Sequence, residues 1–213
     1  MRQYRWVGNR AARLLAVALA SVLVTSASAN LLLNAGFEDG DTGNIGDGVP
    51  NWNVWGNSGW HHDDAGKTLD SKAIKFWWDD AGVWQDVTVA AGQEYEFSVM
   101  ALSASDDLLI GWNGLLKAEF YNSAVGTGSG DVLAAVDVDR FYSASDPQGQ
   151  WVQLSGTVTA PANADLGRII LMIGDWQPDP GGSLNFDNAA INPVPEPAAL
   201  VLLVLAGVVV RRR

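Results

Sequence analysis

A period of two in hydrophobicity is the feature that most limits how this chain can fold. Tyr95, Phe97 and Val99 alternate with glutamate and serine, and residues 151–158 alternate in the same way. Such alternation predicts strands with one buried face and one exposed face. No stretch of the middle region sustains a 3.6-residue period, so we expect no long helix there.

The remaining strand candidates are short apolar or aromatic runs separated by glycine and proline. They cover residues 84–89, 115–121, 168–174 and 183–191. Turn residues between the strands include Gly92, Asp146-Pro147 and Asp179-Pro180. Many short strands with such turns predict an all-β fold, a jelly-roll β-sandwich. The chain has no cysteine, so packing, with or without an oxygen-ligated ion, has to hold the domain together.

The first 29 residues have the order of a cleavable signal peptide. Four arginines precede an apolar run of 11 residues, Leu14 to Val24, and Ala27-Ser28-Ala29 supplies small residues for cleavage. We expect signal peptidase to cut after Ala29, which leaves Asn30 as the first residue. The alternative is a buried or membrane-spanning helix, but the run is shorter than the roughly 20 residues that span a bilayer.

The last segment, residues 193–213, also differs from the middle region. Its first five residues contain three prolines, which cannot continue a strand or a helix. An apolar run of 13 residues, Ala198 to Val210, follows, and three arginines end the chain. The positive-inside rule places these arginines on the cytoplasmic side of a membrane. A helix of that length reaches about 20 Å, so we expect a short C-terminal hydrophobic helix that anchors the chain transiently in the inner membrane.

Three parts of this segment together resemble a PEP-CTERM sorting signal. They are Pro195-Glu196-Pro197, the short apolar helix and the terminal arginine cluster. The resemblance covers about the last 20 residues. It implies export across the inner membrane of a Gram-negative bacterium, followed by removal of the tail by an exosortase, a membrane cysteine transpeptidase or protease. The implied destination is the cell surface or the extracellular space.

Residues 30–192, between these two segments, are strongly acidic. They contain six lysine or arginine residues and 23 aspartate or glutamate residues, a net charge of −17. Such a surface repels nucleic acid and anionic lipid, and it attracts divalent cations. We therefore expect no nucleic-acid partner.

The same region resembles jelly-roll carbohydrate-binding modules of the galactose-binding-like type. Residues 30–38 and Pro50-Asn51-Trp52 are similar to their opening strand and the step after it, and residues 184–191 are similar to their final strand. The resemblance extends over residues 30–192 and implies one β-sandwich domain. It also implies a structural calcium between the first and last strands, at the positions of Glu38 and Asp187.

The residues themselves give a physical reason for such an ion. Asp187 shares its strand parity with Ala189 and Ile191, so its carboxylate is expected to point towards an apolar face. A buried, unpaired carboxylate is costly, and calcium would relieve the cost because it binds carboxylate and carbonyl oxygens. The alternative is that Glu38 and Asp187 are partly exposed acids at strand ends, hydrogen-bonded to backbone amides.

Tryptophan is the main indication of function. Nine of the ten tryptophans lie in residues 30–192, and an indole face suits the C–H face of a sugar ring. Trp52 and Trp84 are expected to be structural, and Trp77 and Trp78, adjacent in a strand, should point to opposite faces. The candidates for glycan binding are the tryptophans set among residues typical of loops: Trp60, Trp176, Trp55 and Trp112.

The histidines and acids do not indicate an enzyme. His61-His62 is expected to lie in a polar loop, because adjacent strand residues point to opposite faces and could not share one site. A glycosidase needs two opposed carboxylates, and nothing in the sequence selects such a pair. We therefore expect an exported, non-catalytic protein that binds extracellular polysaccharide weakly. The alternative is a structural or adhesive matrix protein without a glycan site.

Overall fold

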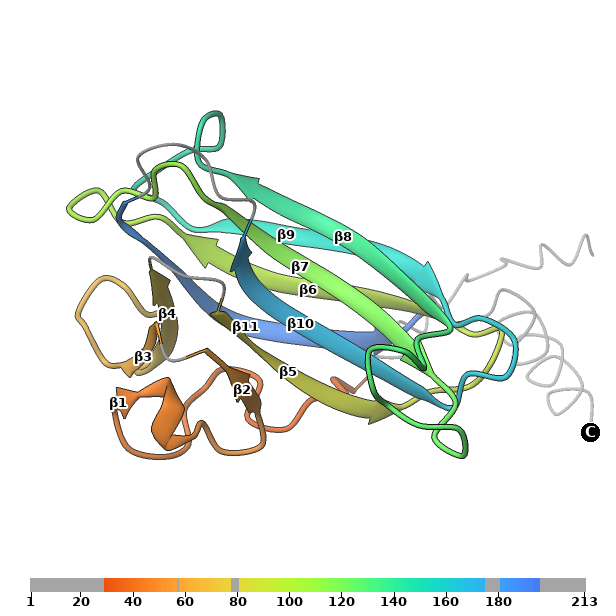
Figure 1. The fold of residues 1–213 in the computed structure, drawn as a ribbon. Coiled ribbons are helices and arrows are strands. Elements are labelled where there is room, and N and C mark those ends of the chain that lie inside the picture. Colours follow the sequence, from red (N-terminus) through yellow and green to blue (C-terminus); the bar gives the residue numbers. More distant parts are fainter. Residues whose placement is uncertain (1–28, 57, 78–80, 175–180, 196–213) are drawn as a thin grey trace, which may run out of the picture.

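A computed structural model describes residues 29–56, 58–77, 81–174 and 181–195. These residues form eleven strands and one 3-10 helix (Figure 1). In chain order the elements are β1 (Gly43–Asn44), η1 (Ile45–Asp47), β2 (Asn53–Trp55), β3 (Gly59–His62), β4 (Ala73–Trp77), β5 (Ala81–Thr88), β6 (Glu94–Leu102), β7 (Asn113–Tyr121), β8 (Ala134–Tyr142), β9 (Val152–Thr159), β10 (Leu166–Gly174) and β11 (Ser183–Pro193). The predicted signal peptide, except Ala29, and the predicted C-terminal helix lie outside the described residues. Within the described parts, no helix has the length and apolar character needed to cross a membrane.

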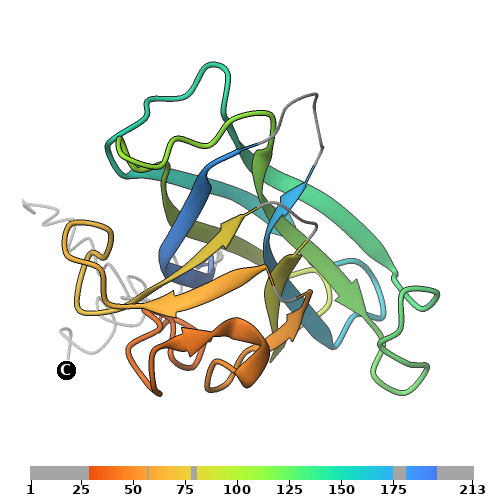
Figure 2. The same ribbon diagram turned by 60° about the vertical axis from the view of Figure 1, so that its left-hand side comes forward.

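The strands form two antiparallel sheets that pack face to face (Figures 1 and 2). The first sheet has the order β1-β3-β4-β11-β6-β9, and the second has the order β2-β5-β10-β7-β8. Consecutive strands repeatedly change sheet, as β4 and β5 do. This arrangement confirms the predicted all-β sandwich.

The core lies between the two sheets and contains the apolar half of each alternation. Phe97 of β6 and Phe120 of β7 meet across it, with ring centroids 6.2 Å apart in an edge-to-face arrangement. Phe76 and Phe186 make a similar contact at 6.0 Å. All four side chains are fully buried, and aromatic side chains in such contacts contribute strongly to core stability. Trp52 is also buried in this core, as predicted.

The strands that the sequence predicts are all found. They correspond to β5, β6, β7, β9, β10 and β11. The sequence does not predict β8, which lies at the edge of the second sheet and has only Phe141 fully buried. It also misses β1, β2 and β3, which are two to four residues long and gain their structure from pairing with neighbours.

β11 changes phase at a bulge between Asp187 and Ala190. Asn188 has a φ of 48° at this point, and the extra residue reverses which side chains face the core. Phe186 therefore faces the core before the bulge and Ile191 faces it after the bulge. Asp187 points away from the core, to the outer face of the first sheet. The expectation that Asp187 points towards the same apolar face as Ala189 and Ile191 is therefore wrong, because the bulge between them reverses the alternation of side chains.

Candidate functional site

The tryptophans predicted to bind glycan lie in different parts of the sandwich. Trp60 lies on β3 and is 42% exposed. Trp55 lies on β2 in the second sheet. Trp112 is only 6% exposed, so it offers no surface to a ligand, which corrects the expectation for that residue. Trp176 lies outside the described residues.

Trp60 lies in a strand and not in the loop that the sequence suggests. β3 pairs with β4, and Trp60 is directly opposite Lys75. Gly59 and His61, its neighbours along the strand, are buried, while Trp60 projects outwards. The sequence of β3 consists of glycine, tryptophan and two histidines, which give no apolar alternation. The strand fixes the direction of Trp60, which points to the outer face of the first sheet.

Lys75 and Trp77 lie on the same outer face. Ile74 and Phe76 are fully buried in the core, so the alternation along β4 turns Lys75 and Trp77 outwards. Lys75 Nζ lies 5.6 Å from the centre of the Trp77 ring, within the range of a cation–π contact. Trp77 is two residues from the direct partner of Trp60, a diagonal distance that aromatic side chains can bridge. Trp60, Lys75 and Trp77 therefore share one face, and Lys75 Nζ also lies 3.8 Å from Asp64 Oδ2.

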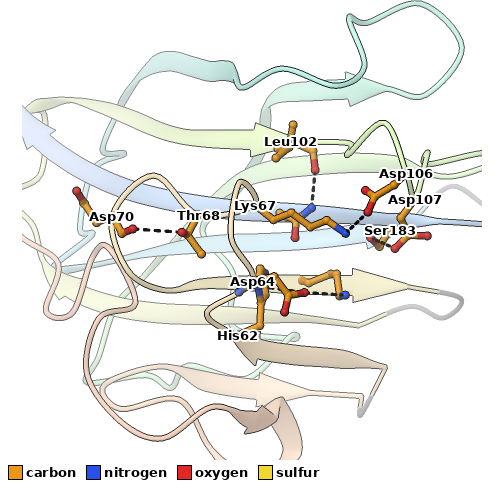
Figure 3. Close-up of polar contacts among 11 residues, drawn as sticks. His62, Asp64, Lys67, Thr68, Asp70, Leu102, Asp106, Asp107 and Ser183 are labelled. Atoms are coloured by element: carbon orange, nitrogen blue, oxygen red, sulfur yellow. Dashed lines mark hydrogen bonds and ion pairs between the residues drawn. The ribbon is translucent and has the colours of Figure 1, made fainter.

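An open pocket of about 350 Å³ adjoins this face. It is lined by Lys75, Trp77, Asp107 and Gly182. Ser183 Oγ donates a hydrogen bond to Asp107 Oδ2 over 2.6 Å, and the Ser183 amide donates to the Asp107 carbonyl over 3.2 Å (Figure 3). These bonds fix one wall of the pocket to the start of β11. A carboxylate, an ammonium group and an indole are thus held around one small volume.

The loop between β3 and β4, residues 63–72, is called the strap here, and it crosses the outer face of the first sheet beside the pocket. Lys67 Nζ lies 2.9 Å from Asp106 Oδ2 on the loop between β6 and β7 (Figure 3). The hydrogen bond from Lys67 lowers the pKa of Asp106. The amide of Leu69 donates to Asp187 Oδ2 over 2.7 Å. Asp64 Oδ2 lies 3.8 Å from Lys75 Nζ, so the strap is attached to β4 as well as to the loop and to β11.

Two polar side chains are buried beneath the strap. His62 on β3 and Asn185 on β11 are 1% and 0% exposed, although both point to the outer face. The Asp64 amide donates to His62 Nδ1 over 3.2 Å, and Asn185 Nδ2 donates to the Leu102 carbonyl over 2.9 Å. His62 Nε2 and Asn185 Oδ1 have no hydrogen-bond partner within the described part of the chain. Burial lowers the pKa of His62 to about 4, so the imidazole is neutral at pH 7.

The expectation that His61 and His62 lie in a polar loop is wrong, because both are buried in β3. They point to opposite faces, as adjacent strand residues do. The ring nitrogens of His61 lie 2.9 Å from the Asp41 carbonyl and 2.6 Å from the Phe37 carbonyl. His61 therefore ties the segment before β1 to the first sheet, and His62 alone faces the strap.

Glu38 and Asp187 both accept hydrogen bonds from backbone amides. Two strap amides donate to Glu38 Oε1, over 3.2 and 3.1 Å. The amides of Leu69 and Asn188 donate to Asp187, each over 2.7 Å. Burial raises the pKa of Asp187 to about 6, although these amides oppose the shift. Burial also acts to raise the pKa of Glu38, but the hydrogen bonds from the Ser71 side chain and the strap amides hold it below its usual value.

The surroundings of Glu38 and Asp187 offer the type of oxygen atoms that calcium binds. A Cβ at Gly36 would lie 3.1 Å from Asn188 Oδ1, 3.9 Å from Asp187 Oδ1 and 3.7 Å from Glu38 Cγ. Two carboxylates and an amide oxygen are hard ligands of this type. Among the residues that the structure describes, no group of three or more His, Cys, Asp or Glu is placed to hold a metal. An ion here would therefore also need amide or carbonyl oxygens.

Trp55 lies on the opposite side of the molecule, on the second sheet. Its ring centroid is 5.7 Å from that of Trp84. The indole lies over Gly82, where a Cβ would come within 2.2 Å of Trp55 Cη2. The Arg168 guanidinium lies 5.5 Å from the Trp84 ring and pairs with Asp86. Trp55 therefore belongs to a packed layer that is separate from Trp60.

Several residues of this site are not predicted from the sequence: Lys75, Asp107, Gly182 and Asn185. The alternation of residues 73–77 is the one local signal that was available, because it places Lys75 on the same face as Trp77. Asp107 and Gly182 come from loops far apart in the chain. Only the pairing of β11 with β4, in which Asn185 is opposite Lys75, brings these parts together.

No protein-family model matches the sequence, and no curated protein matches it. Solved structures do match. The carbohydrate-binding module TmCBM61, solved with β-1,4-galactotriose, has a TM-score of 0.53 and 18% identity, covering 78% of this chain and 100% of its own. The C-terminal family 22 carbohydrate-binding module of Clostridium thermocellum Xyn10B has a TM-score of 0.51 and 16% identity, covering 74% and 90%. The Stig cyclase Fisc from Fischerella sp. TAU has a TM-score of 0.55 and 15% identity, covering 79% and 98%.

Other similar chains are much longer than this one. The matched region spans 21% of the tailspike protein 4 chain of bacteriophage CBA120 and 26% of the MgGH51 α-L-arabinofuranosidase chain. At these identities the similarity establishes the fold, which is that of jelly-roll carbohydrate-binding modules, and it does not establish a function. Binding modules and parts of enzymes both occur among the similar structures.

Proposed function

We propose that this chain is an exported, non-catalytic protein that binds a neutral glycan on the outer face of its first sheet. The observation that carries the proposal is the position of Trp60, Lys75 and Trp77 on one face beside an open pocket. The faces of the two indoles suit the C–H faces of sugar rings. Lys75 Nζ can donate hydrogen bonds to sugar hydroxyls, and the Asp107 carboxylate can accept them.

The expected ligand is neutral and its affinity is modest. A net charge of −17 over residues 30–192 disfavours acidic polysaccharides. An open pocket recovers little buried area against the cost of association, so we expect dissociation constants between millimolar and micromolar, about −4 to −8 kcal/mol. The carbohydrate-binding modules of the same fold support this proposal, and β-1,4-galactan is a reasonable first probe because one of them was solved with β-1,4-galactotriose.

Trp60→Ala is expected to weaken glycan binding by about tenfold or more, because truncating an aromatic anchor of a binding site costs more than about 1 kcal/mol. The measurement is affinity electrophoresis of residues 30–192 through gels containing β-1,4-galactan, hydroxyethyl cellulose or polygalacturonate. The matched control is Tyr142→Ala, which removes an aromatic residue that is 48% exposed on β8, and it should migrate like the wild type.

The other results of this experiment decide between sites and functions. Full retardation of Trp60→Ala together with its loss in Trp55→Ala would move the site to the second sheet. A wild-type domain that no glycan retards would contradict the binding proposal, and the structural or adhesive matrix protein would then be the better reading.

We also propose that a calcium ion joins Glu38 and Asp187. A ligand that binds only the folded state at a hundredfold excess over its dissociation constant stabilises it by about 2.7 kcal/mol. Chelation should then lower the melting temperature of the wild type by about 5–10 °C, and Asp187→Asn should respond little. Asp47→Asn changes an exposed acid elsewhere and should keep the full response. Identical wild-type melting curves in calcium and in chelator would rule the ion out.

Export and sorting complete the proposal. Signal peptidase would release residues 30–213, and an exosortase would later remove the tail at Pro195-Glu196-Pro197. The order of basic, apolar and small residues at the start of the chain supports the first step, and the resemblance to PEP-CTERM signals supports the second. The domain would then act at the cell surface or outside the cell, where polysaccharide is available as a partner.

A further inference from the structure

Two polar atoms beneath the strap lack partners that a buried atom normally has. His62 Nε2 and Asn185 Oδ1 are buried without a hydrogen bond within the described part of the chain. Most buried polar atoms in folded proteins are paired, and each exception calls for a physical reason. Both residues lie on the outer face of the first sheet, where polar side chains normally contact water. The strap is what removes them from solvent.

The two atoms have opposite hydrogen-bonding roles. His62 Nδ1 accepts from the Asp64 amide, so the proton of the neutral ring is on Nε2, which is a donor. Asn185 Nδ2 donates to the Leu102 carbonyl, which leaves Oδ1 as an acceptor. The Asn185 side chain is close enough to His62 to act on its pKa, in the direction that raises it, although the two atoms do not form a hydrogen bond with each other. A hydroxyl group accepts one hydrogen bond and donates another, so one hydroxyl between them can satisfy both atoms. Sugars carry such groups on nearly every ring carbon.

The pair lies next to the exposed part of the site. Asn185 is the direct partner of Lys75 across the β11–β4 ladder, and Lys75 lines the pocket. His62 is two residues from Trp60 on the same side of β3. Asp64 of the strap contacts both sides of this boundary, with its amide bonded to His62 Nδ1 and its Oδ2 3.8 Å from Lys75 Nζ.

The contact that closes the strap over this position is a weak one. Lys67 reaches across to Asp106 (Figure 3), and the Asp106 side chain is 69% exposed. Ion pairs with an exposed member contribute little to stability, so this contact can open at small cost. At the start of the strap, Asp64 Oδ2 lies 3.8 Å from Lys75 Nζ, and this pair also has an exposed member. The contacts of Leu69 with Asp187 and of Ser71 and Lys72 with Glu38 lie further along the loop and hold its second half.

We infer that the strap is a movable wall of the glycan site, and that His62 Nε2 and Asn185 Oδ1 bind one sugar hydroxyl when the contact between Lys67 and Asp106 opens. This inference rests on the proposed glycan binding and adds a covered position to that site. A site that is complete only in the open state has its apparent affinity reduced by the fraction of molecules that are open. Loosening the closing contact should therefore strengthen binding.

The test is the affinity of Asp106→Ala for β-1,4-galactan, or for whichever neutral polysaccharide retards the wild type. We expect the dissociation constant to fall about two- to fivefold, the range set by removing an exposed ion pair. Asp63→Ala is the matched control, because it removes one exposed negative charge from the strap itself and leaves the closing contact intact. Its dissociation constant should equal that of the wild type.

A double variant tests whether the gain in affinity depends on the buried pair of His62 and Asn185. Adding His62→Phe to Asp106→Ala removes the donor and should cancel the gain, with the melting curve as the check on folding. Hydrogen exchange at the Leu69 amide, which is bonded to Asp187, should be faster in Asp106→Ala than in Asp63→Ala. If the double variant does not fold, Asp106→Ala and Asp63→Ala still decide.

Each remaining outcome overturns the inference, and one also overturns the proposed function. Equal affinities of Asp106→Ala and Asp63→Ala, with binding that still depends on Trp60, would leave the glycan site intact and remove the movable wall. A gain that survives His62→Phe would show that His62 does not bind the ligand. Absence of wild-type binding to every polysaccharide would remove both proposals together.

Discussion

Gly182→Ala should lower the free energy of unfolding by about 3 kcal/mol or more and weaken glycan binding as well. Gly182 has a φ of +70°, which costs an alanine about 1–2 kcal/mol. An alanine Cβ would also lie 1.7 Å from the Leu108 carbonyl oxygen, so the backbone of the neighbouring loop has to move. That loop carries Asp107, which lines the pocket. We expect the melting temperature to fall by about 6–12 °C.

The adjacent residue provides the control. A Cβ at Gly181 would have no neighbour within 4 Å, so Gly181→Ala should change stability by less than about 0.5 kcal/mol. Its amide still bonds to the Ile110 carbonyl over 2.9 Å in that variant. Denaturant unfolding of both variants checks the difference. Equal stability of the two would mean that the close approach at Gly182 is not a constraint on this loop.

Replacing Pro195-Glu196-Pro197 by three alanines should stop release of the protein and leave it in the inner membrane. The reason is that the proposed exosortase would no longer recognise its substrate, while the apolar run and the arginines would still hold the chain. Membrane fractionation and mass spectrometry of the secreted material check this result. The secreted wild type should begin at Asn30 and lack residues 201–213.

The control for sorting is Val194→Ala, next to the motif. Val194 is held through its backbone amide, which donates to the Glu94 carbonyl over 2.8 Å, and alanine retains that bond. Secretion of this variant should be normal. Secreted wild-type protein that still contained residues 201–213 would contradict tail removal.

The strands that can be predicted are those whose side chains alternate between core and solvent. β6 is predicted well because tyrosine, phenylalanine and valine occupy every second position, and β9 because valine and leucine occupy three of its four alternate positions. β3 is not predicted, because the side of the strand that faces the core carries Gly59 and His61 and shows no apolar alternation. The polar His62 on its outer face is also buried. In that strand burial comes from the strap and from the segment before β1, which no local pattern reveals.

The site itself could be predicted only in part, for a physical reason. Trp60 stands out because it is a tryptophan among polar and small residues. Its neighbours Lys75 and Asp107 become neighbours only through strand register and loop packing, which depend on contacts between distant segments. The predicted direction of the Asp187 side chain is wrong for a related reason, because one inserted residue at Asn188 reverses the alternation of side chains along β11.

The path of β11 also determines how the domain would be oriented if the proposed C-terminal anchor held it in a membrane. The strand starts at Ser183, beside the pocket, and ends at Pro193 after eleven residues, which at about 3.3 Å each span roughly 35 Å (Figure 1). The Leu31 amide bonds to the Ile191 carbonyl over 3.0 Å, so the start of the domain lies at the Pro193 end as well. A domain tethered through the chain that follows Pro193 therefore directs its pocket away from the tether. A polysaccharide can reach the pocket while the opposite end of the sandwich is still attached.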